Sequence, residues 1–291
     1  MARPRDPGQW LGVFARGMAM GVAEVVPGVS GGTIAFVTGI YRELVGSLAS
    51  FGGRSLRTLF REGPRQFWLE HNLSFLALLG LGMALSVVLF ARLIAGWLEV
   101  APPLVFGFFC GLIMASVVHI GRARSIRLLL SYGALGLLIG LLMLLLDPLA
   151  RQDSLWVFFF GGMIAVCAWL LPAISGSFLL LILGLYTPVI EAINELYLPI
   201  LVVLAAGCAV GLLSFSKGLN WLMMRHGEAL LALLTGFMAG SLPRLWPWTV
   251  DAARLSPATY EVLTQQSAFL PWVWVMVLAG AVSLWLLSRF E

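Results

Sequence analysis

The sequence predicts an all-α polytopic membrane protein with an inverted repeat, in which each half contains an interrupted, re-entrant helical hairpin and three transmembrane helices. Three observations lead to this prediction: the composition, a series of long apolar runs, and a motif that occurs twice. Of the 291 residues, 60% are hydrophobic and only 11% are charged. Soluble domains carry about 25% charged residues. The composition therefore excludes an ordinary soluble domain.

The duplicated motif is Pro27-Gly28-Val29-Ser30-Gly31-Gly32, which recurs as Pro172-Ala173-Ile174-Ser175-Gly176-Ser177, 145 positions later. An ungapped alignment of residues 14–41 with residues 159–186 contains nine identities in 28 positions. The identical pairs are Phe14/Phe159, Gly17/Gly162, Met18/Met163, Ala23/Ala168, Pro27/Pro172, Ser30/Ser175, Gly31/Gly176, Gly39/Gly184 and Tyr41/Tyr186. We interpret this similarity as an internal duplication with a polar, helix-breaking centre.

Each half is predicted to contain the same elements in the same order. In the first half, residues 1–150, these are a hairpin at 10–50, a basic insertion at 51–72, and helices at 73–98, 102–121 and 126–146. In the second half, residues 151–291, these are a hairpin at 156–193 and helices at 198–222, 228–243 and 270–288. Most of the uninterrupted runs reach the roughly 20 residues that one bilayer crossing requires.

The number of crossings predicts that the two halves have opposite orientations. A hairpin adds no membrane crossing if it is re-entrant and two if it spans. With three further helices, each half therefore has an odd number of crossings. When a unit with an odd number of crossings is repeated in tandem, the second copy is inverted in the membrane. The arginines indicate which side is cytoplasmic. With the N-terminus inside, eleven arginines face the cytoplasm and only Arg151, Arg244 and Arg254 lie outside. We therefore predict a multi-pass protein with both termini cytoplasmic.

The insertion at 51–72 carries four arginines at spacings of three, four and four, namely Arg54, Arg57, Arg61 and Arg65. As a helix, this segment would lie on the inner membrane surface with a basic stripe toward anionic lipid. The alternative is that the arginines only set the orientation of the chain. Membrane lipids are thus expected contacts, and the small basic excess gives no reason to expect nucleic acid.

The two motifs have the composition of an anion site. A proline followed by serine and glycines inside an apolar run ends one helix and begins another, which leaves backbone amides without intrahelical partners. We expect the new helices to begin at Thr33 and Phe178 and to offer free N–H groups to an anion such as a phosphate. The predicted binding residues at the two centres are Pro27, Gly28, Ser30, Gly31, Gly32, Thr33, Ser175, Gly176 and Ser177. The alternative is that these small residues only permit close helix packing.

Ionisable residues occur in the first hairpin only. Arg16 aligns with Gly161, and Glu24 aligns with Trp169. Charged groups within a membrane are costly and commonly functional. We expect Arg16 to neutralise a bound phosphate and Glu24 to carry a coupling proton or to orient the loop amides. The alternative for Arg16 is a residue that extends to the inner interface.

The stretch from Gly21 to Thr33, followed by Gly39-Ile40-Tyr41, resembles the signature of a bacterial membrane family assigned as polyprenyl-phosphate transporters. The second motif, continuing to Gly184-Leu185-Tyr186, is similar to that family's pattern. The resemblance implies a plasma-membrane flippase that returns undecaprenyl phosphate, or a related polyprenyl phosphate, from the outer to the inner leaflet for cell-wall biogenesis. The resemblance does not identify the coupling ion, for which a proton and a sodium ion are the two alternatives. It also leaves open whether the protein forms a homo-oligomer.

Other function classes fit the residues less well. Gly28-Val29-Ser30-Gly31-Gly32 matches the G-x-S-x-G pattern of serine hydrolases, but such a serine requires a general base, and neither His71 nor His226 is expected in the membrane core. A lipid phosphatase would need a nucleophile beside intramembrane arginines. A small-anion channel or exchanger with broken helices is the main transport alternative, and a membrane scaffold is the non-catalytic one. We therefore predict no enzymatic activity, no cofactor and no metal site.

Overall fold

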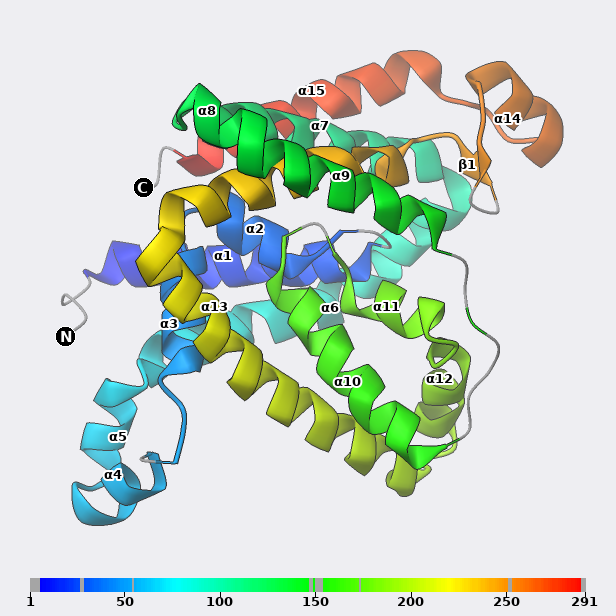
Figure 1. Cartoon of the computed structure of the whole chain (residues 1–291). Coiled ribbons are helices and arrows are strands. Elements are labelled where there is room, and N and C mark those ends of the chain that lie inside the picture. Colours follow the sequence, from blue (N-terminus) through cyan, green and yellow to red (C-terminus); the bar gives the residue numbers. More distant parts are fainter. Residues whose placement is uncertain are drawn as a thin grey trace. The chain divides into compact units, whose positions relative to one another are not determined.

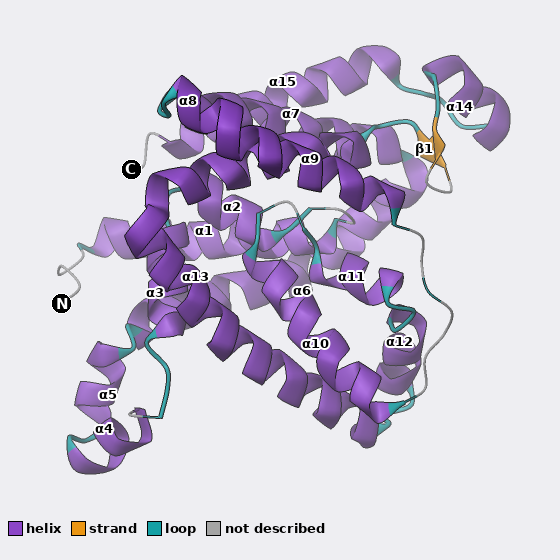
Figure 2. Cartoon of the chain, in the orientation of Figure 1, coloured by secondary structure: helices purple, strands orange, loops and turns teal. Residues whose placement is uncertain are grey.

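The computed structural model describes residues 6–26, 29–53, 55–146, 149, 154–172, 174–250 and 253–288. These residues are mostly helical (Figure 1). The described part contains one antiparallel ribbon, in which β1 (Thr249–Val250) pairs with β2 (Ala253–Arg254) (Figure 2). The predicted helical class is therefore confirmed, with this short ribbon as an addition.

The chain forms two compact units, and each of them takes residues from both predicted halves. Unit 1 comprises Met1–Val87 and Leu146–Gly227, and unit 2 comprises Val88–Leu145 and Glu228–Glu291. Two long helices, α6 (Leu73–Val100) and α13 (Leu198–Ser241), contribute to both units. The repeat boundary near residue 150 describes the sequence duplication and stays a prediction.

Unit 1 contains the two interrupted hairpins. The first is built from α1 (Pro7–Val25), α2 (Gly31–Val37) and α3 (Tyr41–Ala49), and the second from α10 (Leu155–Leu170), α11 (Gly176–Ile182) and α12 (Tyr186–Asn194). In each hairpin the first helix packs against the short helix that follows the motif, and α10 also contacts α2. Both motifs therefore lie within one unit.

Unit 2 contains plain helices and an ordered connection. Its elements are α7 (Pro102–Arg122), α8 (Ile126–Leu128), the π-helical turn η1 (Leu129–Gly133), α9 (Ala134–Leu142), the 3₁₀ turns η2 (Met143–Leu145) and η3 (Leu242–Leu245), the ribbon, α14 (Pro257–Thr264) and α15 (Leu270–Ser288). Within the connection before α15, the Trp248 indole donates to the Ala268 carbonyl at 2.9 Å. Trp248 belongs to the same buried cluster as Val273 of α15, so the connection packs against the helix.

Several helices are long and apolar enough to cross a membrane. Within the described residues four pass this test: Leu73–Phe90, Pro102–Arg122, Ile126–Leu145 and Leu198–Leu245. The pair α11 and α12 passes only when the two are taken together, with a bend of 110° between them. A multi-pass membrane protein is confirmed, while the side on which each terminus lies stays a prediction.

The segment after residue 198 contains two helices that meet at a kink, and this kink lies between the predicted helices at 198–222 and 228–243. It runs without a loop from Leu198 to Ser241, with a kink at His226, where φ is −135° and ψ is 37°. At 1.5 Å per residue, 44 helical residues would extend about 66 Å if straight, about twice the hydrocarbon thickness. The kink therefore replaces the predicted loop as the point where the helix changes direction.

The basic insertion also differs from the single helix that its arginine spacing predicts. It forms two short helices, α4 (Ser55–Arg61) and α5 (Pro64–Glu70), which make an arm of unit 1 (Figure 1). Gly63 lies between them with φ of 92°, and Pro64 begins the second helix. Since a left-handed glycine ends a helix and proline favours a new start, the arginine pattern is divided. Arg54 lies outside the described residues.

The two hairpins turn at matching glycines. Gly39 has φ of 75° and Gly184 has φ of 69°. These left-handed conformations strain residues with a Cβ, so the two glycines are required by the turns into α3 and α12.

Helix contacts are duplicated together with the sequence. A Cβ on Gly17 of α1 would clash with the Leu79 carbonyl of α6, and a Cβ on Gly162 of α10 would clash with the Leu204 carbonyl of α13. The reciprocal contacts also correspond, with Gly82 against the Phe14 carbonyl and Gly207 against the Phe159 carbonyl. Small residues let membrane helices approach closely. The same pair of helices therefore packs in the same way in both halves.

Candidate functional site

The first hairpin tip is held by the hydroxyl of Ser30, which is completely buried. Its Oγ accepts a hydrogen bond from the Gly32 amide at 3.1 Å and donates to the Trp169 carbonyl of the second hairpin at 3.2 Å. Ser30 thus caps α2 and links the two hairpins. Pro27 and Gly28, which the sequence also assigns to this tip, lie outside the described residues.

Glu24 provides the carboxylate of the site. Its Oε1 accepts a hydrogen bond from the Gly31 amide at 2.5 Å. The Trp169 side chain hydrogen-bonds to the same carboxylate, and its indole N–H is the only donor it has. Because Trp169 is the residue that aligns with Glu24, the two hairpins meet through equivalent positions of the repeat.

The second hairpin tip has a different arrangement. Ser175 is buried, whereas Ser177 is exposed, and their Oγ atoms lie 2.7 Å apart. The Ser175 side chain makes no capping bond to α11. Gly176 lies against the Ala165 carbonyl, as Gly31 lies against the Met20 carbonyl at the matching place. The two tips are alike in backbone packing, but only the second presents an exposed hydroxyl.

Two details of the predicted anion site are wrong. The short helices begin at Gly31 and Gly176, two residues before the predicted starts at Thr33 and Phe178. In the first hairpin the expected free amides are already bonded: Gly31 to Glu24, Gly32 to the Ser30 hydroxyl, and Thr33 to the Ser30 carbonyl at 2.9 Å. The reason is that Glu24 lies in the last turn of α1, close enough for its carboxylate to accept from the Gly31 amide, which the broken helix leaves without a partner.

Arg16 lies away from the tips. It is half-buried on α1, and its Nη1 lies 3.1 Å from the place where a Cβ on Gly12 would stand. The side chain therefore folds toward the start of α1, whereas Glu24 lies about 12 Å further along the helix axis. The structure brings Glu24, Ser30, Gly31 and the second hairpin together, while the Arg16 side chain folds toward Gly12 on its own helix.

Trp169 is the site residue that sequence reasoning missed. The alignment of the two repeats identifies it only as the uncharged counterpart of Glu24. A donor-only side chain aligned with an acceptor-only one, within a repeat whose halves were expected to meet, is the signal that would have identified it. Among the described residues, no group of three or more histidine, cysteine, aspartate or glutamate side chains is placed to hold a metal ion.

Comparison with known proteins identifies relatives of this chain. The model of the undecaprenyl phosphate translocase-like family matches residues 20–263, a range that contains both motifs. A polyprenyl-phosphate transporter from Vibrio cholerae is 38% identical over 287 residues, covering 92% of each chain. A polyprenyl-phosphate transporter from Staphylococcus aureus is 30% identical over 259 residues, covering 82% of this chain and 87% of the relative. No solved structure matches the chain.

Proposed function

Because the chain belongs to the undecaprenyl phosphate translocase-like family, we propose that it moves undecaprenyl phosphate, or a related polyprenyl phosphate, from the outer to the inner leaflet of the bacterial plasma membrane. The observation that carries this proposal is the 38% identity to the Vibrio cholerae transporter across 92% of both chains. The family model matches residues 20–263, which include both motifs and the four candidate spans of the described residues, so the similarity is not limited to one motif.

The proposed arrangement in the membrane is inverted. Residues 1–150 and 151–291 form the two repeats, both termini are cytoplasmic, and the hairpins enter from opposite leaflets. The recurrence of the Gly17–Leu79 contact as Gly162–Leu204 supports the duplication on which this arrangement rests. Broken helices are tolerated at membrane depth only where they are buried in protein or line a polar cavity, and the buried Ser30 tip is consistent with that requirement.

The proposed phosphate site lies between the two tips. Ser175 and Ser177 supply hydroxyl groups that are bonded to each other in this conformation and can turn toward a ligand. The Trp169 indole and the Gly31 amide supply N–H donors. Gly32 and Gly176 allow the tips to pack closely, because a Cβ would clash with the Trp169 and Ala165 carbonyls. Pro27 and Gly28 shape the first turn, and the buried Thr33 supports it. An isoprenoid tail remains in lipid if the site opens sideways.

Glu24 competes with a phosphate for the same donors. Two unit charges 4 Å apart repel by about 4 kcal/mol at an effective dielectric constant of 20. A phosphate therefore enters readily only when Glu24 takes up a proton or moves aside. We assign Glu24 the coupling role: ionised, it occupies the Gly31 amide, and protonated, it yields that amide to the substrate. A proton is the favoured coupling ion, and sodium is the alternative.

Arg16 acts on the approach to the site. Its guanidinium points toward the start of α1, so it meets a phosphate head before the head reaches the tips. This role differs from the direct neutralisation expected from the sequence. Ser30 has no hydrolytic role in this proposal, because its hydroxyl donates to the Trp169 carbonyl.

Reconstitution in liposomes tests the proposed function. Purified protein should move a polyprenyl monophosphate between leaflets and should bind it in preference to the pyrophosphate by native mass spectrometry. Chloride flux without lipid phosphate, in liposomes where no lipid moves, would instead support the small-anion channel.

A further inference from the structure

The helices α7 and α15 of unit 2 are closely packed where their glycines face each other, and a groove follows this contact. They run parallel, and a Cβ on Gly111 would clash with the Val277 carbonyl, while a Cβ on Gly280 would clash with the Phe108 carbonyl. One turn further along each helix, the corresponding positions hold Ala115 and Leu284. Both of these side chains line the groove.

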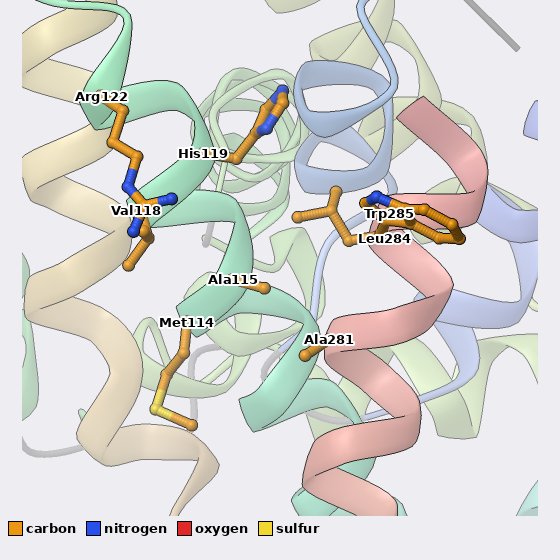
Figure 3. A pocket seen from close by; sticks show the side chains of 8 residues that line it. All are labelled: Met114, Ala115, Val118, His119, Arg122, Ala281, Leu284 and Trp285. Carbon is orange, nitrogen blue, oxygen red and sulfur yellow. The ribbon is translucent and has the colours of Figure 1, made fainter. Parts of the chain in front are cut away.

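The groove has a volume of about 600 Å³. Figure 3 shows Ala115 and Ala281 on its facing sides, with Val118 on α7 and Trp285 on α15 as larger walls. Val118 is 49% exposed and Trp285 is 52% exposed, so the groove is open along its flank. Of the two helices, α7 is a candidate membrane span and α15 is a shorter apolar helix. Within a bilayer, such an apolar flank faces lipid hydrocarbon.

Two basic residues line the end of the groove. His119 and Arg122 lie in the last turn of α7, and the Arg122 side chain folds back along the helix toward Val118 (Figure 3). Neither takes part in an ion pair within the described residues. The nearby carboxylate of Glu228 is already paired with Arg124 at 2.6 Å. Arg122 is also the last residue of a candidate span, which places the cationic end at the membrane surface.

We propose that this groove binds an anionic phospholipid of the surrounding bilayer. The phosphate of the headgroup contacts Arg122 and His119, and an acyl chain lies along Val118, Ala281 and Leu284. The groove matches such a lipid in charge and in its position across the membrane. Its basic end lies at the interface, where the phosphate is, and its apolar wall continues into the hydrocarbon. Basic pockets between helix ends are a general mode of anionic lipid recognition. The proposal does not depend on the transport function, because the hairpin tips belong to unit 1.

Native mass spectrometry of the full-length protein, offered equal amounts of phosphatidylglycerol and phosphatidylcholine with the same acyl chains, tests the proposal. The wild type should retain phosphatidylglycerol in preference. Arg122→Gln should reduce that preference about fivefold, the effect of one basic residue near a membrane surface. Arg127→Gln, a matched loss of charge on α8 that does not line the groove, should leave the preference unchanged. Ala281→Trp should remove the phosphatidylglycerol adduct by filling the groove.

Three results would overturn the proposal. These are equal retention of the two lipids by the wild type, an equal effect of Arg122→Gln and Arg127→Gln, or a folded Ala281→Trp variant that keeps the adduct. Displacement of phosphatidylglycerol by equimolar undecaprenyl phosphate would also overturn it, because the groove would then belong to the transport path. Arg122 is exposed, so its replacement leaves the fold intact and the test does not rely on Ala281→Trp alone.

Discussion

The carboxylate of Glu24 and the side chain of Trp169, which occupy matching positions in the two halves of the chain, are hydrogen-bonded to each other. A duplication alone would place identical residues at such a point. Here one half supplies an acceptor and the other a donor, so the pair closes the contact between the hairpins without two like charges. Because of this asymmetry, Glu24 carries the ionisable group at this contact and its counterpart Trp169 carries none.

Glu24→Gln should uncouple lipid movement from pH. Glutamine keeps an oxygen that accepts from the Gly31 amide but carries no charge, so the proposed competition with phosphate is lost. We expect polyprenyl phosphate to bind about tenfold more tightly, since a nearby negative charge is removed, and the flipping rate to become insensitive to pH. Flipping in proteoliposomes across a pH series measures this. Glu62→Gln, on the exposed arm, is the matched control, and an unchanged pH profile in Glu24→Gln would exclude the coupling role.

Ser30 and the Ser175/Ser177 pair should differ in what their loss affects. Ser30→Ala leaves the buried Gly32 amide and Trp169 carbonyl unpaired, which costs about 1–3 kcal/mol of folding stability. Ser175→Ala/Ser177→Ala should lower affinity for polyprenyl phosphate with a smaller change in melting temperature. Thermal unfolding and lipid binding, measured on the same preparations, separate the two effects. Wild-type affinity in the double variant would contradict the proposed site.

Arg16→Gln should weaken substrate capture. A charge-assisted contact to phosphate contributes about 1.5–3 kcal/mol, so we expect at least a tenfold loss of affinity for the monophosphate. Titration with lipid phosphate in detergent measures it. Arg57→Gln, on the exposed helix α4, removes the same charge from the arm and should leave affinity unchanged. If the two variants behave alike, Arg16 is only an interfacial residue.

The duplicated helix contacts should be equally sensitive to added volume. Gly17→Ala and Gly162→Ala each force a methyl group against a backbone carbonyl, and overpacking of this kind costs about 1–3 kcal/mol. Gly80→Ala, at an exposed position of α6 with no atom within 4 Å of the new Cβ, should be neutral or slightly stabilising. Melting temperatures test this. A tolerated alanine at either buried glycine would mean that the helices are not in close contact there.

The inverted arrangement predicts on which side each loop is accessible. In a cysteine-free background, Ser125→Cys in the turn after α7 should react with a membrane-impermeant maleimide only from the cytoplasmic side. Ser267→Cys, in the connection before α15, should react only from outside. Both positions are exposed. Labelling of both from the same side would show that the predicted parity of crossings is wrong.

Much of the fold was accessible from the sequence because bilayer solvation is a strong local constraint. The plain spans were predicted from their apolar runs, since each backbone polar group in hydrocarbon must be satisfied within its own segment. The loop-free kink at His226 and the division of the arm at Gly63 were not. Each of these two features depends on the backbone conformation of a single residue, and the spacing of apolar and basic residues does not specify that conformation.

The sequence by itself determined a duplicated membrane protein with two polar helix breaks and with ionisable residues in only one of the two hairpins. The tertiary structure decided what those residues contact. Glu24 bonds the Gly31 amide, Ser30 reaches the Trp169 carbonyl, and the Arg16 side chain folds toward Gly12. The physical reason is that a broken helix creates unpaired amides wherever its proline and glycines lie. Which group satisfies them depends on side chains that only packing brings within hydrogen-bonding distance.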